Sequence, residues 1–328
     1  MSEITFYNEP KLSEHEVDQK FNERRMTLVP HVKDFISNHE RFKDKDVSVT
    51  FADKGVSSLI SIIETSDEKL VLRIPLSLTH TLGDAQFLKV WEQAGVRVPH
   101  VFEDGILNGH QYILMEFIDA KTLTETYHKG ETINREIYVE LGKILRVMHE
   151  PEAKGYGRSL DNKNIKAEFH QFKDWLDSPE MQKRIEYARE NNLLGEEHGS
   201  LSLAFEILIT HINDNKKSSY CHNDFGTSNT FATNPLTIFD PSPGFNDGYI
   251  DLGRSIMRTI ANDGGLSRAG EQLIKGYFKE KPYNKRALQA SILLNAYMKF
   301  PYGHKVKNFE QIKNVQEYLV KTKHLLEK

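Results

Sequence analysis

Three side chains suited to phosphoryl transfer lie in one short polar segment of the chain. His222 and Asp224 form a His-x-Asp pair, and Asn229 follows five residues after the aspartate. Two short apolar runs joined by Thr-Asn-Pro come next, and the second run ends in Asp240. We expect a tight hairpin here, which would bring Asn229 and Asp240 side by side. Their amide and carboxylate oxygens could hold a hard cation, while Asp224 could take the proton of an incoming hydroxyl, as in phosphoryl transfer.

This segment resembles a known family. His-Asn-Asp-Phe-Gly-Thr-Ser-Asn at 222–229 resembles the catalytic loop of the aminoglycoside phosphotransferase and choline kinase superfamily, small-molecule kinases with a protein-kinase-like fold. Asp240 and the later Asp251-Leu-Gly-Arg resemble the family's metal-binding aspartate and the Asp-Leu that opens a helix. Asp224-Phe-Gly has the same sequence as the metal-binding motif of protein kinases. The asparagine five residues after Asp224, Asn229, instead indicates that this segment is the catalytic loop. A polar turn between core strands is the alternative, and the spacing of three separate elements argues against it.

The resemblance implies a role for each matching position. Asp224 orients and deprotonates the acceptor hydroxyl, and Asn229 and Asp240 bind Mg²⁺. His222 is expected to orient the loop. Asp251 is expected to cap the helix that it opens, a contribution of ~1 kcal/mol, and to support the loop. The similarity extends over roughly 45–300, with its specific motifs at 220–254.

Composition excludes several other classes of protein. The chain has 328 residues, of which 38% are apolar and 27% charged, enough for two lobes with a substantial core. The net charge of −4 lacks the positive excess that is typical of nucleic-acid-binding proteins, so no nucleic-acid partner is expected. Cys221 is the only cysteine, so no intrachain disulfide is possible, which favours a cytoplasmic location. We find no signal peptide and no run of ~18 apolar residues, so no membrane partner is expected.

Residues 1–117 are predicted to form a nucleotide-binding lobe, with a helical extension over 1–45. In the extension, Ser13 and Glu16 form a Ser-x-x-Glu capping box before a first helix. Pro30 separates this helix from a second, short amphipathic one. The strands of the lobe are predicted from β-rich runs at 47–51, 59–63, 69–74, 96–102 and 111–118.

The predicted nucleotide site is distributed over this lobe. Backbone N–H groups of a Gly/Ser turn could cradle phosphates. The resemblance places Arg73 where many kinases carry lysine, to steady the α- and β-phosphates, with Asp84 as its partner acid. A surface strand arginine and an ordinary helix-start aspartate are the alternatives, and the adenine contacts fall on the hinge backbone. The predicted contacts are Gly55, Ser57, Ser58, Arg73, Asp84, the Glu116 carbonyl and the Ile118 amide.

Residues 118–328 are predicted as a larger, helical lobe with the catalytic loop and the substrate site. Residues 138–149 resemble the family's long central helix, and 161–217 match its variable substrate-specifying insertion. This insertion has eleven acids against eight Lys and Arg, too small an excess to establish a polycationic substrate. Glu168, Asp174 and Asp177 could still face a cationic acceptor, since they lie three or six residues apart. A solvated helix face is the alternative.

Together these features predict an α+β, two-lobed protein-kinase-like fold with a small antiparallel sheet lobe and a larger helical lobe. The expected reaction moves the γ-phosphoryl group of ATP to a hydroxyl of a small molecule, with Mg²⁺ as cofactor. We favour an aminoglycoside-like, cationic acceptor. Choline, sugar, amino-acid and macrolide kinases share this loop and are the alternatives. The sequence does not distinguish ATP from GTP as the donor, and it does not indicate an oligomeric state.

Three other functions are weighed against this one. A protein kinase is disfavoured because only ten residues separate Asp240 from Asp251, too few for a peptide-binding activation segment. Asn223 also stands where many protein kinases carry arginine before the catalytic aspartate. A catalytically silent nucleotide-binding module is disfavoured because both metal ligands and Asp224 are present. A purely structural protein would show no stabilisation by Mg-ATP.

Overall fold

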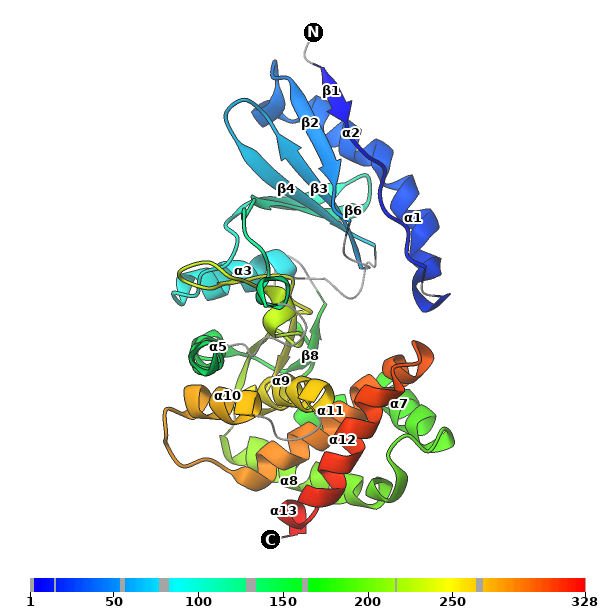
Figure 1. The fold of residues 1–328 in the computed structure, drawn as a ribbon, viewed down its shortest axis with the longest axis vertical. Coiled ribbons are helices and arrows are strands. Elements are labelled where there is room, and N and C mark those ends of the chain that lie inside the picture. Colours follow the sequence, from blue (N-terminus) through cyan, green and yellow to red (C-terminus); the bar gives the residue numbers. More distant parts are fainter. Residues whose placement is uncertain are drawn as a thin grey trace.

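The computed structural model describes residues 3–14, 16–53, 57–76, 83–127, 134–160, 165–215, 217–263 and 268–327. These residues form two lobes, and the strands of the smaller lobe lie above the helices of the larger one in Figure 1. The predicted α+β organisation is therefore confirmed. The chain leaves the sheet at the end of β6 (His110–Glu116), and we keep residue 117 as the proposed boundary between the lobes.

The smaller lobe contains a six-stranded sheet in the order β1-β2-β3-β4-β6-β5. Its strands are β1 (Ile4–Phe6), β2 (Val47–Phe51), β3 (Ser58–Glu64), β4 (Lys69–Pro75), β5 (Val101–Leu107) and β6. Buried and less buried residues alternate along β2, as expected for a strand with one face on the core. The strands predicted at 47–51, 59–63, 69–74 and 111–118 are confirmed within two residues at each end.

One predicted strand is wrong, and one strand was not predicted. Residues 96–100 are not part of β5, which begins at Val101. The Arg97 carbonyl instead accepts a hydrogen bond from Ile238 N (2.9 Å) in the catalytic hairpin, and Pro99 has no N–H to offer a sheet. β1 is only three residues long, too short for a visible alternation. It pairs parallel to β2, so the sheet is mixed rather than purely antiparallel.

The first helical segment of the extension is present, but without the predicted capping box. A 3₁₀-helix covers Glu16–Phe21, and α1 (Asn22–Thr27) follows it. The backbone of Ser13 is bound by the Asn22 side chain at 2.8 and 2.9 Å, so Ser13 does not cap a helix. Asp18, in the 3₁₀-helix, accepts a hydrogen bond from Tyr302 of the larger lobe (3.4 Å). The extension therefore contacts both lobes.

The second helix of the extension is present as α2 (Val29–Asn38), and it buries Val32, Phe35 and Ile36 against the sheet core. Pro30 lies in its first turn, where a missing N–H costs nothing. A further 3₁₀-turn (Glu40–Phe42) leads into β2.

Helix α3 (Asp84–Gln93) connects the two lobes. It precedes the proposed boundary, yet Phe87 and Trp91 are fully buried in the core of the larger lobe. The centroid of the Phe87 ring lies 4.9 Å from the ring centroid of Tyr220 and 5.1 Å from that of Phe245. Asp84, the expected partner acid of Arg73, is the first residue of α3, and Trp91 of this helix stacks on His222 of the catalytic loop.

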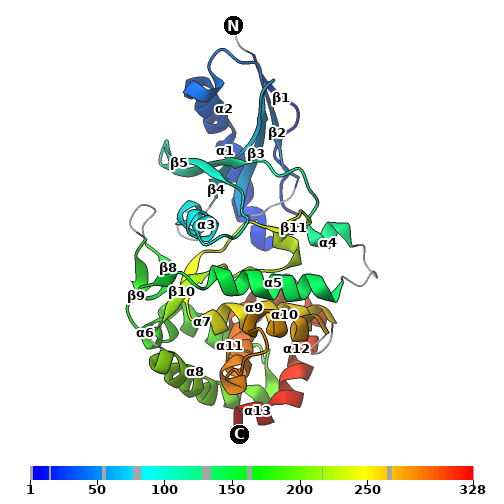
Figure 2. The same cartoon turned by 90° about the vertical axis from the view of Figure 1, so that its left-hand side faces the viewer.

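The larger lobe combines helices with a second, small sheet, which lies at the left-hand side of the lobe in Figure 2. Its strands, in the order β7-β10-β13-β8-β9, are β7 (Glu152–Ala153), β8 (Tyr156–Ser159), β9 (Ala167–Phe169), β10 (Ser218–Cys221) and β13 (Gly244–Asn246). The helices are α4 (Leu123–Thr126), α5 (Arg135–Met148), α6 (Phe172–Leu176), α7 (Pro179–Glu190), a 3₁₀-helix (Gly195–Ser200), α8 (Leu201–Asn215), α9 (Gly248–Asp263), α10 (Arg268–Phe278), α11 (Lys285–Lys305), α12 (Phe309–Thr322) and α13 (His324–Glu327). The central helix is thus confirmed as α5. None of the described helices is both long and apolar enough to cross a membrane.

Helices α5 and α10 pack closely because each carries a glycine at their contact. A Cβ at Gly142 would lie 2.3 Å from the carbonyl oxygen of Leu273, and a Cβ at Gly276 would lie 2.0 Å from that of Val139. Both obstacles are backbone atoms of helices, which cannot rotate aside as a side chain can. Neither position therefore accepts a larger residue without moving one helix.

We expect Gly276→Ala to destabilise the protein by about 1–3 kcal/mol or more, because the added methyl forces α5 and α10 apart. Gly303→Ala in α11 is the matched control, since its nearest atoms would lie 3.7 Å away. The control should gain about 0.5–1 kcal/mol from helix propensity. Urea unfolding of both variants measures the difference. Equal stabilities would contradict the close helix contact.

Candidate active site

The predicted hairpin is present and brings the two expected metal ligands together. Its strands β11 (Thr230–Phe231) and β12 (Thr237–Ile238) pair antiparallel. Phe239 N donates to the carbonyl oxygen of Asn229 (3.1 Å), which places Asp240 beside Asn229 at the open end of the hairpin. Asp240 has a φ of 53°. Such a left-handed conformation is uncommon outside glycine and often marks functional positions.

Asp224 is bound by Asn229 through one carboxylate oxygen. The Asn229 side-chain amide donates to Asp224 Oδ2 (2.9 Å) and to the Asp224 carbonyl oxygen (2.8 Å). Because the amide nitrogen is used in this way, the amide oxygen of Asn229 is the atom left to serve as a metal ligand.

The other carboxylate oxygen of Asp224 faces three cations. Oδ1 lies 3.2 Å from Arg258, and it lies 3.7 Å from both Arg254 and Lys299. Burial opposes ionisation of Asp224, but Arg258, Lys299 and Arg254 together outweigh it and hold the pKa of its carboxyl well below the usual range. Asp224 is therefore a stable anion with its two oxygens turned toward different surroundings.

His222 orients the catalytic loop from a fully buried position. Its ring stacks on Trp91 of α3, with centroids 5.7 Å apart and an interplanar angle of 8°. Nδ1 accepts a hydrogen bond from Asp224 N (3.2 Å), so the proton lies on Nε2, which donates to the Phe239 carbonyl oxygen (3.0 Å). Burial lowers the pKa of His222 and keeps the ring neutral. One ring thus joins the catalytic loop to the hairpin.

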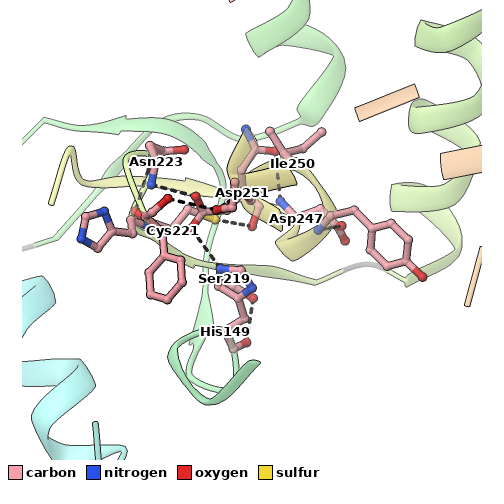
Figure 3. A network of polar contacts seen from close by, with 12 residues as sticks. His149, Ser219, Cys221, Asn223, Asp247, Ile250 and Asp251 are labelled. Carbon is pink, nitrogen blue, oxygen red and sulfur yellow. Dashed lines mark hydrogen bonds and ion pairs between the residues drawn. The ribbon is translucent and has the colours of Figure 1, made fainter. Parts of the chain in front are cut away.

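Asp251 braces the same loop through its carboxylate (Figure 3). Its fully buried carboxylate accepts hydrogen bonds from His222 N (2.7 Å) and Asn223 N (2.9 Å) and contacts His149 Nε2 (3.1 Å). Burial opposes its ionisation, but the contact with His149 prevails and lowers the pKa of Asp251. Asn223, held between this brace and Asp224, has a φ of 53°.

The helix-capping role expected of Asp251 is wrong. Asp247 performs it, since its side chain accepts a hydrogen bond from Tyr249 N (2.8 Å) at the start of α9. The carboxylate of Asp251 points away from its own helix and satisfies N–H groups of another segment.

The neighbouring Cys221 does not turn this brace into a metal site. Ligand atoms of His149, Cys221 and Asp251 lie within 4.8 Å of one another. However, the thiol donates to the carbonyl oxygen of Asn246 (3.5 Å), and burial raises its pKa well above the ordinary value. Both ring nitrogens of His149 are also engaged, Nε2 by Asp251 (3.1 Å) and Nδ1 by the Tyr277 hydroxyl (2.9 Å). His149 is therefore a hydrogen-bonded packing residue.

Arg73 lies where the sheet meets the catalytic hairpin. Its guanidinium is 2.5 Å from a carboxylate oxygen of Asp84 and 2.9 Å from one of Asp240, and its Nε donates to Ser58 Oγ (3.0 Å). Burial opposes its charge, but Asp84 and Asp240 outweigh burial and raise the pKa of Arg73. Burial raises the pKa of Asp84 to about 7, in spite of the facing guanidinium. Arg73 is 3% exposed, so it is not a surface strand residue.

The other predicted nucleotide residues are less closely assembled. Ser57 borders the Gly/Ser turn and its carbonyl accepts from Leu76 N (2.8 Å), while Gly55 lies outside the described residues. The Glu116 carboxylate binds Arg97 (Nη1–Oε2, 2.7 Å), and Ile118 lies in the connection between the lobes. Adenine binding by the Glu116 carbonyl and Ile118 amide stays a prediction.

A cavity of about 690 Å³ opens in the larger lobe beside Asn223, the residue before Asp224. Arg254 and Lys299, which face Asp224, form one wall, and α7 with β8 and β9 forms the other. Glu168 lines it, but Asp174 and Asp177 do not. These two acids are exposed, and Asp177 pairs with Lys173 (3.3 Å). They belong to a solvated helix face.

Sequence reasoning missed the cations around Asp224. Arg254 and Arg258 lie three and seven residues after Asp251, a spacing that places all three on one face of α9. That spacing could have indicated them. Lys299 has no comparable signal, because α11 reaches the site only through tertiary packing.

Comparison with known proteins adds a family to this geometry. The model of the phosphotransferase enzyme family matches residues 48–263. A solved structure of aminoglycoside phosphotransferase APH(4)-Ia, a thermostable mutant with AMP-PNP and hygromycin B, is 14% identical with a TM-score of 0.60, over 90% of this chain and 97% of that one. Spectinomycin phosphotransferase APH(9)-Ia with ADP and spectinomycin is 14% identical with a TM-score of 0.53, over 88% and 97%. Plasmodium vivax ethanolamine kinase is 12% identical with a TM-score of 0.51, over 94% and 89%.

Among curated proteins, no sequence is similar enough to count as a relative. Identities this low establish a shared fold and not a shared substrate. They confirm the predicted protein-kinase-like architecture. Because the family model matches more than half of the chain, this protein belongs to the phosphotransferase enzyme family.

Proposed function

We propose that the protein transfers the γ-phosphoryl group of ATP to a hydroxyl of a small molecule. The arrangement of Asp224 carries this proposal, because one carboxylate oxygen contacts Asn229 and the other faces the cations that line the cavity. A hydroxyl entering from the cavity would bond to the γ-phosphorus as the bond to the β-bridging oxygen breaks, and its proton would pass to Asp224. Since the cations keep Asp224 a weak base, its main contribution is to orient the hydroxyl. Similarity to structures with AMP-PNP and ADP supports ATP as the donor.

Asn229 and Asp240 would hold Mg²⁺ at the open end of the hairpin. The Asn229 amide oxygen is not used by the bonds to Asp224, and the Asp240 side chain is 48% exposed although it contacts Arg73. These are the oxygen donors that Mg²⁺ prefers, but they are too few for a site made of protein alone. Bound there with the nucleotide, Mg²⁺ would neutralise charge on its phosphates.

Arg73 would steady the α- and β-phosphates. Its side chain is already oriented by Ser58 and Asp84, so no rotamer freedom remains to be lost when the nucleotide binds. Ser57 and the turn before it would lie near the phosphates, with adenine at the hinge.

The class of acceptor remains the open part of this proposal. The relatives have hygromycin B or spectinomycin bound, or are named for ethanolamine, which would support the aminoglycoside-like, cationic acceptor that we expected. Sugars, amino acids, choline and macrolides are the alternatives. The charges of the cavity, five Lys and Arg against two Glu, favour an anionic acceptor instead. A cytoplasmic location stays an expectation.

Nucleotide binding should depend on a divalent metal. With Mg-ATP at ~100 times its dissociation constant, the free energy of unfolding should rise by ~2.7 kcal/mol. ATP with a chelator should raise the free energy of unfolding much less, because no metal ion is then available for the nucleotide phosphates and the protein to bind jointly. A thermal shift assay measures both. Equal shifts with and without Mg²⁺ would show that the metal site is assigned wrongly.

Asp224→Asn and Asp240→Asn should fail in different ways. The first variant keeps both metal ligands, so it should bind Mg-ATP nearly normally while turnover falls by orders of magnitude. The second loses a metal carboxylate and should weaken Mg-dependent nucleotide binding as well. Calorimetric titration with Mg-AMP-PNP distinguishes them. The reverse pattern would assign the metal to Asp224.

The stability of Asp84→Asn relative to the wild type should increase as pH rises from about 4, the ordinary carboxyl pKa, to about 7. Between these pH values Asp84 of the folded wild type holds its proton while the same carboxyl of the unfolded chain loses it. The free energy of unfolding of the wild type therefore falls as pH rises, whereas Asn at this position does not ionise and adds no such pH dependence. Urea unfolding at pH 5 and pH 8 measures the change. A difference that stays constant between these pH values would contradict the buried position of Asp84. The same variant should bind Mg-AMP-PNP more weakly, because Arg73 loses its partner.

A further inference from the structure

The cavity beside Asn223 has more cations than carboxylates. Its walls carry five Lys and Arg against two Glu: Arg158, Lys183, Arg184, Arg254 and Lys299, with Glu168 and Glu180. Two of these cations, Arg254 and Lys299, lie 3.7 Å from Oδ1 of Asp224. An aminoglycoside or another polycation would bring further positive charge into this wall.

The carboxylates of the cavity are already engaged by its cations. Glu180 contacts Arg158 and also Arg184, whose Nη2 lies 2.8 Å from Glu180 Oε1. Asp224 shares a single oxygen among Arg258, Arg254 and Lys299. Both oxygens of Glu180 and Oδ1 of Asp224 are therefore already close to positive side chains, and Oδ2 of Asp224 is bound by Asn229. Glu168 is the remaining acid of the wall.

The excess of positive charge is concentrated near Asp224. Arg254 is buried, with a side chain 11% exposed, and Lys299 is 36% exposed. Arg254 and burial together lower the pKa of Lys299 to about 7. A lysine resists protonation in this way where neighbouring cations outnumber the anions that would offset them. An anion bound in the cavity would remove this repulsion.

The phosphates of the nucleotide do not account for Arg254 and Lys299. Both residues approach Asp224 at Oδ1, whereas Asn229 contacts Oδ2. Both also line the cavity together with α7, and Asn229, Asp240 and Arg73 do not line it. The cations thus lie on the acceptor side of Asp224, opposite the proposed metal and nucleotide.

We propose that the acceptor is a hydroxylated molecule with at least one anionic group, a carboxylate or a phosphate, bound by Lys299, Arg254 and Arg184. This inference rests on the proposed kinase function. The acceptor oxygen forms a bond to the γ-phosphorus, the nucleoside diphosphate leaves with the electron pair of the broken bond, and the hydroxyl proton passes through Asp224 to solvent. The anionic group stays unchanged and serves only to anchor the acceptor.

Four matched hexoses test the charge preference at pH 7. Glucosamine is cationic, glucose neutral, glucuronate carries a carboxylate and glucose 6-phosphate carries a phosphate. Each is titrated by calorimetry into the protein saturated with Mg-AMP-PNP, so that the nucleotide site is already filled. We expect one or both anionic hexoses to bind more tightly than glucose and glucosamine, and the tighter of the two identifies the anchoring group.

Variants locate the binding. Lys299→Met and Arg184→Met should each weaken anionic hexose binding by about tenfold or more, as expected for loss of a hydrogen bond to a charged group. Lys313→Met on α12 is the matched control and should have no effect, since Lys313 is 72% exposed and does not line the cavity. Circular dichroism melting checks that the variants fold.

Two results overturn the inference without touching the kinase assignment. One is binding of glucose or glucosamine at least as tight as that of both anionic hexoses, including the absence of any anionic binding. The other is anionic binding that both cavity variants leave unchanged. Absence of Mg-AMP-PNP binding in the first step would instead contradict the proposed function itself.

Discussion

The catalytic loop depends on one buried carboxylate. Isolating the charge of Asp251 from water costs several kcal/mol unless it is fully paired, and the partners that pair it are backbone N–H groups of His222 and Asn223 together with His149. Those bonds fix the backbone immediately before Asp224, including the left-handed conformation of Asn223. The direction of the Asp224 side chain, the proposed catalytic group, is therefore set by a buried residue outside the loop.

A second buried charge organises the other side of the site. Arg73 joins β4 to α3 through Asp84 and to the hairpin through Asp240, and α3 returns to the loop through the stacking of Trp91 on His222. An ion pair so deeply buried is a poor source of stability. Its value lies in orientation, because it holds Arg73, the proposed phosphate-binding group, and Asp240, a proposed metal ligand, in fixed register. Asp224 lies between this proposed nucleotide side and the cation-rich side proposed for the acceptor.

The features that the sequence predicted correctly are those that depend on residues close together in the chain. The hairpin that joins Asn229 to Asp240 follows from turn residues between apolar runs, and most strands of the smaller lobe follow from their alternation. The capping box at Ser13 failed because Asn22 binds the same backbone. The strand expected at 96–102 failed because the Arg97 carbonyl bonds to the hairpin instead. Lys299 could not be predicted, since only the packing of α11 against α9 brings it to Asp224.

The N-terminal extension ties the two lobes together at the edge of the acceptor cavity. Phe21 packs on the core of the smaller lobe, while Asp18 accepts a hydrogen bond from Tyr302, which also lines the cavity. Kinase-like enzymes admit and release their ligands by hinge motion of one lobe against the other. A hinge opening that carries the extension with the sheet must pull Asp18 away from Tyr302. The described part of the extension thus joins the two lobes a second time, apart from the chain segment that connects them.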